Sequence, residues 1–134
     1  MQAGRLEEAE AALEEALRLR PSYAAAELTL GNTLRKLKKC DKAIPHYESV
    51  IKSQPEDPFA HGNLGYCYSL VGRQPDAIAQ LVRATELSPN EVQWRSSLGA
   101  LYRQTKQHDK ALPHHEKAAQ LDPNNPDVLR NLAV

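Results

Sequence analysis

The sequence lacks an excess of charge of either sign, since 17 lysines and arginines balance 17 aspartates and glutamates over 134 residues. Binding to duplex nucleic acid consists largely of phosphate neutralisation and needs a basic excess on one face. Long hydrophobic runs are also missing, because no apolar stretch approaches the ~18 residues of a spanning helix. We therefore expect neither a nucleic-acid partner nor a membrane partner.

Aromatic and β-branched residues are scarce. The chain has one Phe, one Trp and 13 β-branched residues, against 18 alanines and 18 leucines. Alanine and leucine favour helices, whereas β-branched and aromatic residues favour strands. The composition therefore predicts a helical protein and argues against a sheet-rich fold.

Cysteine is nearly absent as well. Cys40 and Cys67 lie 27 residues apart and match neither a CxxC motif nor a disulfide framework. We interpret both as structural thiols in a reducing compartment. Glu7 and Glu8 exclude an apolar signal core near the start, so the expected location is cytoplasmic, although the ends of the chain look truncated.

What the sequence does contain is a repeat. A leucine followed by a small residue recurs every 34 residues, at Leu30-Gly31, Leu64-Gly65, Leu98-Gly99 and Leu132-Ala133. The same period relates Pro21, Pro55, Pro89 and Pro123. The chain then divides into the second half of a unit (1–23), three complete units (24–57, 58–91 and 92–125) and the start of another (126–134).

Each unit has the pattern of two helices. Leu64, Tyr68 and Val71 follow the i, i+4, i+7 spacing of one helical face, and Gly65 allows a second helix to approach closely. The second helices should begin near Asp41, Pro75 and Asp109, residues suited to an N-cap or a first turn. With Asp41 and Asp109 as N-caps, the later prolines Pro45 and Pro113 would occupy the fourth helical position, where a missing N–H costs nothing.

The repeat resembles that of the tetratricopeptide repeat (TPR) family, and the resemblance covers the whole chain. The unit 58–91 matches best, with Leu64, Gly65, Tyr68, Gly72, Ala77, Leu81, Ala84 and Pro89 in the corresponding places. The resemblance implies a single all-α array over 1–134, a right-handed superhelical solenoid of antiparallel helix pairs with a concave and a convex side. Both ends fall inside a helix pair, so we expect a fragment of a longer array whose open ends allow self-association.

No catalytic or cofactor motif is visible. There is no GxGxxG, P-loop or GxSxG sequence. His114 and His115 are adjacent on a helix and point about 100° apart, so they do not converge on a metal. We expect no enzyme activity, no metal and no cofactor, and solvated or partly packed histidines.

The strongest local charge is the run Arg35-Lys36-Leu37-Lys38-Lys39. Such a cluster can bind nucleic acid, an importin or an anionic lipid. At the end of a helix it also complements the helix dipole. We favour the second interpretation, a solvated helix end.

The concave surface is the candidate binding site. In the TPR family it is lined by positions 2, 5, 6, 9, 12 and 13 of each first helix. Those positions carry amides, hydroxyls, cations and two aromatics here, a mixture suited to an extended peptide; the alternative is an ordinary hydrophilic helix surface. The predicted groove residues are Asn32, Arg35, Phe59, Asn63, Tyr66, Gln93, Ser97, Arg103, Arg130 and Asn131.

Two groove types of the family differ in the residues that line them. Chaperone-binding members clamp a C-terminal carboxylate with two asparagines and three cations. Asn32 and Asn63 match the asparagines, but the cation positions hold Leu28, Gln93 and Ser97. The O-linked N-acetylglucosamine transferase type carries an asparagine ladder, which only Asn63 and Asn131 continue.

We therefore predict a non-catalytic protein–protein interaction module that binds a peptide segment of a partner in its concave groove, in a scaffold or adaptor. The alternatives are a recognition arm of a larger enzyme, such as a glycosyltransferase, and a self-assembling structural scaffold.

Overall fold

The computed structural model describes residues 2–126. They form α-helices joined by short turns, with no strand in that range. The helices are α1 (Gln2–Leu19), α2 (Ala24–Lys36), α3 (Cys40–Ser53), α4 (Pro58–Leu70), α5 (Gln74–Leu87), α6 (Val92–Gln104) and α7 (His108–Leu121). The predicted all-α solenoid is confirmed. The expected start of a further repeat at 126–134 lies almost wholly outside the described residues.

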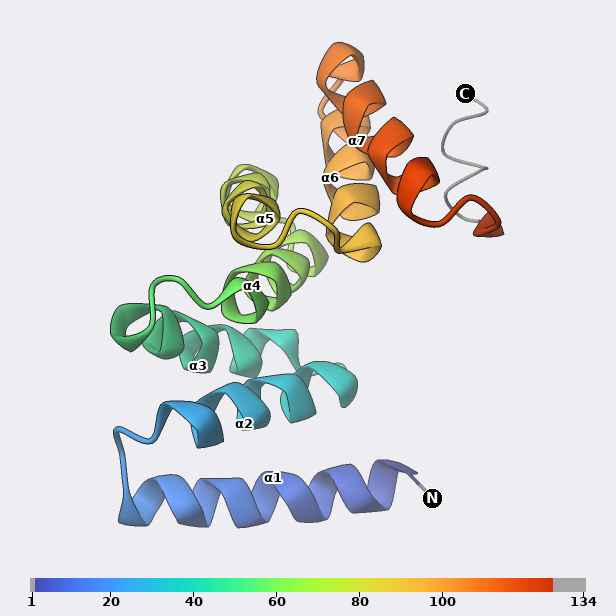
Figure 1. The fold of residues 1–134 in the computed structure, drawn as a ribbon. Helices are drawn as coiled ribbons and strands as arrows, with labels where there is room; N and C mark the ends of the chain where they lie inside the picture. Colours follow the sequence, from blue (N-terminus) through green and yellow to red (C-terminus); the bar gives the residue numbers. More distant parts are fainter. Residues whose placement is uncertain (1, 127–134) are drawn as a thin grey trace.

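The helices stack in chain order and the stack curves. Every helix packs on the next one, and in addition α2 contacts α4 and α4 contacts α6. Among the described helices, α1, α3, α5 and α7 do not contact one another. The row of α2, α4 and α6 is therefore the closer-packed, inner side of the curve. Figure 1 shows the helix axes turning from lying across the view at α1 to running up it at α6 and α7.

The turn inside each helix pair is built on a left-handed residue. Lys38, Gly72 and Lys106 have φ values of 63°, 84° and 62° and are spaced 34 residues apart. In each turn the next residue donates its N–H to a carbonyl five residues earlier, as from Lys39 to Leu34 at 2.8 Å. This hydrogen bond closes the first helix and reverses the chain.

The two helices of a pair meet at the glycine of the leucine–glycine motif. A Cβ on Gly65 would come within 2.7 Å of Leu81 Cγ and 3.1 Å of the Ala77 carbonyl oxygen. Gly31 and Gly99 make the equivalent approach to Tyr47 and His115. The close helix contact predicted from the sequence is present.

The second helices begin near Asp41, Pro75 and Asp109 as predicted, but the interpretation of Asp41 and Asp109 as N-caps is wrong. Lys39 is the N-cap of α3, without a side-chain cap, and the N–H of Ala43 already donates to its carbonyl at 3.0 Å. The turn therefore starts the helix early and places Pro45 at its sixth residue rather than its fourth. A proline there cannot donate to the carbonyl of Asp41. Pro113 has the same place in α7.

The prediction of two free thiols is also wrong. Cys40 and Cys67 form a disulfide, with their Cα atoms 5.1 Å apart. Cys40 begins α3 and Cys67 lies on α4, so the bond joins the second helix of one unit to the first helix of the next. Stacking of successive units brings the two residues together, which their spacing in the sequence does not reveal. Because the two cysteines are paired, they no longer support the expectation of a reducing compartment.

Two histidines are more buried than expected. His61 is 7% exposed and bonds through its ring nitrogens to Gln80 Oε1 and the Pro55 carbonyl, both at 2.7 Å. His115 is 4% exposed, and neither of its ring nitrogens has a hydrogen-bond partner among the described residues. The interpretation as solvated or partly packed imidazoles is wrong for both, because the neighbouring helix covers them.

Candidate functional site: the concave face

The concave face is the exposed side of the α2, α4 and α6 row. Eight of the ten predicted groove residues lie in the described part of the chain, and all eight are at least partly exposed. Two of them, Phe59 and Tyr66, are exposed aromatics of α4, at 51% and 37%. Arg130 and Asn131 lie outside the described residues.

Asn32 and Asn63 are bound to each other across successive units. Asn63 Nδ2 donates to Asn32 Oδ1 at 2.8 Å, and Tyr47 Oη donates to the same oxygen at 2.7 Å. Tyr47 has no exposed surface, and burial raises the pKa of its hydroxyl, while the charge of nearby Arg35 opposes the rise. This network ties the groove surface of α2 and α4 to the buried face of α3.

Arg35 and Tyr66 lie against each other on the concave face. The Arg35 guanidinium carbon lies 5.8 Å from the centroid of the Tyr66 ring, within cation–π range. Two pockets have this pair in their linings. The smaller has a volume of about 40 Å³ and is lined by Arg35, Asn63, Tyr66, Gln93, Trp94 and Ser97.

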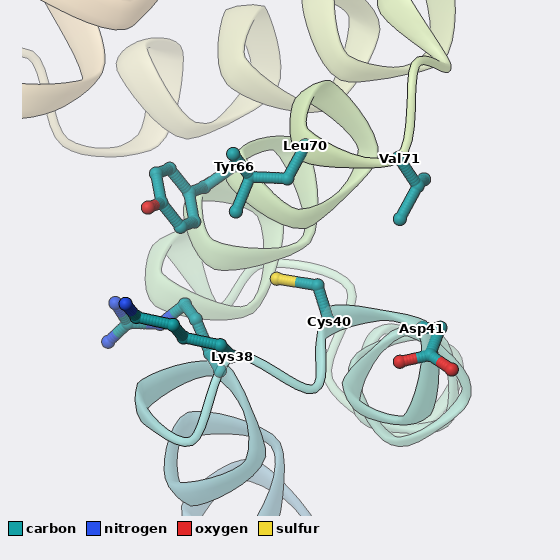
Figure 2. Close-up of a pocket in the computed structure, with 7 residues that line it drawn as sticks. Lys38, Cys40, Asp41, Tyr66, Leu70 and Val71 are labelled. Carbon is teal, nitrogen blue, oxygen red and sulfur yellow. The ribbon is translucent and has the colours of Figure 1, made fainter.

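The larger pocket, which we call the α2–α4 pocket, has a volume of about 510 Å³. In Figure 2 Tyr66, Leu70 and Val71 lie on one side and Lys38, Cys40 and Asp41 on the other. Lys38 is opposite Tyr66, whereas Asp41 is nearer Val71. Apolar side chains therefore face a rim that is cationic at one end and anionic at the other. The complete lining is Arg35, Lys38, Cys40, Asp41, Tyr66, Leu70 and Val71.

The structure thus brings five predicted groove residues around two connected pockets: Arg35, Asn63, Tyr66, Gln93 and Ser97. Sequence reasoning missed Lys38, Cys40, Asp41 and Val71, because they belong to the turns and the next helix rather than to the first-helix positions considered. The signal in the sequence that could have identified them is their position directly after α2 or α4.

Trp94 was also missed. It is 6% exposed and packs against Gly62, where any Cβ would collide with its ring. Phe59 meets the same ring edge-on at a centroid distance of 5.6 Å. The glycine at 62 therefore serves the packing of α4 on α6, and Phe59 is held at the surface by a buried aromatic.

Arg103 lies apart from this pair of pockets, near the C-terminal end of α6. Its Nη1 atom is buried and has no hydrogen-bond partner within residues 2–126. Burial lowers the pKa of His115, and the charge of Arg103 lowers it further. Arg103 Nη1 and both ring nitrogens of His115 are therefore buried polar atoms without a hydrogen-bond partner in the described part of the chain.

Nothing in the described range suggests metal chemistry or a membrane span. Residues 2–126 contain no group of three or more histidine, cysteine or acidic side chains placed to hold a metal ion. No described helix is long and apolar enough to cross a membrane.

The fold and its concave row define an α-solenoid built from helix-pair repeats. Models of the tetratricopeptide repeat match residues 1–58, 46–79 and 93–125. The chain belongs to the tetratricopeptide repeat family.

Known proteins share this repeat. The chain is 34% identical over 128 residues to Hsp70-Hsp90 organizing protein 2 of Arabidopsis thaliana, an alignment that covers 93% of this chain and 22% of that protein. The chain therefore spans about a fifth of the length of this relative.

Solved structures have the same fold. MamA superimposes with a TM-score of 0.91 at 23% identity, covering 96% of this chain and 75% of that one. YrrB, described as a TPR protein with an unusual peptide-binding site, superimposes with a TM-score of 0.88 at 24% identity, covering 98% and 68%. At these identities the likeness shows the fold.

Proposed function

We propose that the chain is a non-catalytic interaction module that binds an extended peptide segment of a partner protein along the concave row of α2, α4 and α6. One observation carries the proposal: two neighbouring pockets on this face share Arg35 and Tyr66 in their linings. Together the two pockets offer both apolar contact and hydrogen-bonding groups, which an extended peptide requires.

The organising role in the name of the Arabidopsis relative and the peptide-binding site in the description of YrrB support a protein ligand. The carboxylate clamp of chaperone-binding members is incomplete here, because Leu28, Gln93 and Ser97 replace its cations. We therefore propose a ligand other than an acidic chaperone C-terminus.

Binding of degenerate, fluorescently labelled peptide pools to the full chain tests this function. Tyr66→Ala should weaken the binding of selected peptides about tenfold or more, since buried aromatic contacts dominate most interfaces. Tyr23→Ala is a matched control, because Tyr23 is another exposed tyrosine and Arg20 lies 4.5 Å from its ring centroid. Equal affinity of both variants and the unmodified chain would exclude the concave site.

A further inference from the structure

We propose that the α2–α4 pocket is an anchor for a bulky apolar side chain of the partner, and that the residue beside it in the partner is acidic and binds at the Arg35–Lys38 end. This proposal rests on the proposed function and names the chemistry of its ligand.

The apolar wall is the first argument. Leu70 is 60% exposed and Val71 43% exposed, and with Tyr66 they place three neighbouring apolar surfaces in one pocket. Contiguous exposed apolar surface on a folded protein marks an interaction site.

Packing of the solenoid does not require apolar residues at the positions of Tyr66 and Leu70. The preceding unit has Asn32 and Lys36 there, whereas Leu37 stands at the position of Val71. The following unit replaces the same two positions and that of Val71 with Ala100, Gln104 and Thr105. The repeat fold therefore forms with polar or small side chains in place of Tyr66 and Leu70, so the apolar surface of these two residues is available to a ligand.

Charge at the rim selects the neighbouring group. Within the described chain, Arg35 and Lys38 form no ion pair with a carboxylate. Asp41 lies at the other end of the pocket, nearer Val71 than Tyr66 (Figure 2). A partner carboxylate gains from the cationic end and is repelled from the other, so charge complementarity fixes the direction of the peptide as well as its composition.

The size and connection of the pocket favour a peptide side chain. A volume of about 510 Å³ accommodates a side chain as large as phenylalanine or tryptophan. The pocket shares Arg35 and Tyr66 with the smaller pocket, where Asn63, Gln93 and Ser97 provide hydrogen-bonding groups for the continuing backbone. An anchored side chain and an extended backbone can therefore be bound together.

Four pools of short labelled peptides test the proposal against the full chain, with a fixed central Glu-Phe, Gln-Phe, Lys-Phe or Glu-Ser pair. The Glu-Phe pool should bind about tenfold more tightly than the Lys-Phe and Glu-Ser pools, with Gln-Phe between them. Equal binding of all four pools would overturn the proposal.

Two variants with matched controls locate the effect. Leu70→Ser should abolish the preference for phenylalanine, whereas Leu112→Ser, at another leucine that is 51% exposed, should not. Lys38→Glu should shift the preference towards the Lys-Phe pool, whereas Lys106→Glu, which has the same left-handed backbone, should leave it unchanged. Circular dichroism of each variant confirms that the helices are intact.

The outcomes separate the two proposals. If peptides bind and lose affinity in Gln93→Ala but not in Leu70→Ser or Lys38→Glu, the groove function holds and the anchor proposal is wrong. If no pool responds to any concave variant, the groove function itself is wrong.

Discussion

The side-chain amide of Asn63 donates a hydrogen bond of 2.8 Å to Asn32 Oδ1, so two residues that the sequence assigns to ligand contact are bound to each other. Tyr47 Oη donates to the same oxygen. Asn32 therefore accepts the hydrogen bond of the buried Tyr47 hydroxyl as well as that of Asn63, whereas Asn63 contributes only its Nδ2 atom to the network.

This difference predicts that the two asparagines respond differently to truncation. Asn32→Ala leaves the buried Tyr47 hydroxyl without its acceptor and should lower the free energy of unfolding by about 1–3 kcal/mol. Asn63→Ala should change stability by less than about 1 kcal/mol and act mainly on peptide binding. Urea unfolding of both variants measures this, and equal losses would contradict the network.

Replacement of the buried His115 by leucine should stabilise the protein. His115 has no hydrogen-bond partner for either ring nitrogen among the described residues, while Leu81 fills the equivalent position in the preceding unit against Gly65. His115→Leu should raise the free energy of unfolding by about 1–2 kcal/mol, the cost of an unsatisfied buried polar group. A lower midpoint in urea would show that the imidazole makes contacts that leucine cannot.

The same histidine predicts a loss of stability in acid. Burial, followed by the charge of Arg103, lowers the pKa of His115 below its ordinary value of 6.5, so the unfolded chain takes up the proton first. The stabilising contribution of the neutral imidazole is fully present above the ordinary pKa of histidine. As the pH drops through that ordinary pKa towards the lower pKa of the folded state, the free energy of unfolding falls.

Urea midpoints measured across this pH range test the expectation. His115→Leu should decline less steeply than the unmodified chain. Some decline should persist in the variant, because burial and the charge of Arg95 also lower the pKa of His114. A parallel decline in both proteins would assign the whole effect to other groups.

The left-handed turns provide a further prediction. Lys106 has a φ of 62° at the position that Gly72 occupies in the preceding unit. Lys106→Gly should raise the free energy of unfolding by roughly 0.5–1 kcal/mol, because glycine adopts this backbone without steric cost. Lys106→Ala removes the same charge but keeps the Cβ, so it should give no such gain in a thermal melt.

The disulfide predicts a dependence on reductant. The Cys40–Cys67 bond closes a loop between residues 27 apart, and its loss should cost about 3–4 kcal/mol by loop-closure entropy. Urea unfolding with and without a phosphine reductant measures the change. The double variant Cys40→Ser, Cys67→Ala is the reductant-insensitive control. Two freely titrating thiols in the untreated folded protein would contradict the bond.

The sequence predicted contacts within one repeat unit but not contacts between successive units. The 34-residue period alone predicts the helix pairs and the contact between Gly65 and the second helix, because both are set within one unit. The Cys40–Cys67 bond and the contact between Asn32 and Asn63 depend on how one unit is rotated against the next. That rotation results from side-chain packing between units, which a constant period does not specify. The α2–α4 pocket was not predicted for the same reason, because residues of two successive units and of a turn line it together.

An NMR titration shows directly whether the concave row binds the partner peptide. Amide shifts of the full 15N-labelled chain are followed as the tightest peptide from the Glu-Phe pool is added. If the peptide binds to the concave row, saturable shifts should be concentrated at Arg35, Lys38, Asn63, Tyr66 and Leu70. Shifts confined to the outer helices α3, α5 and α7, with these concave amides unmoved at saturation, would contradict it.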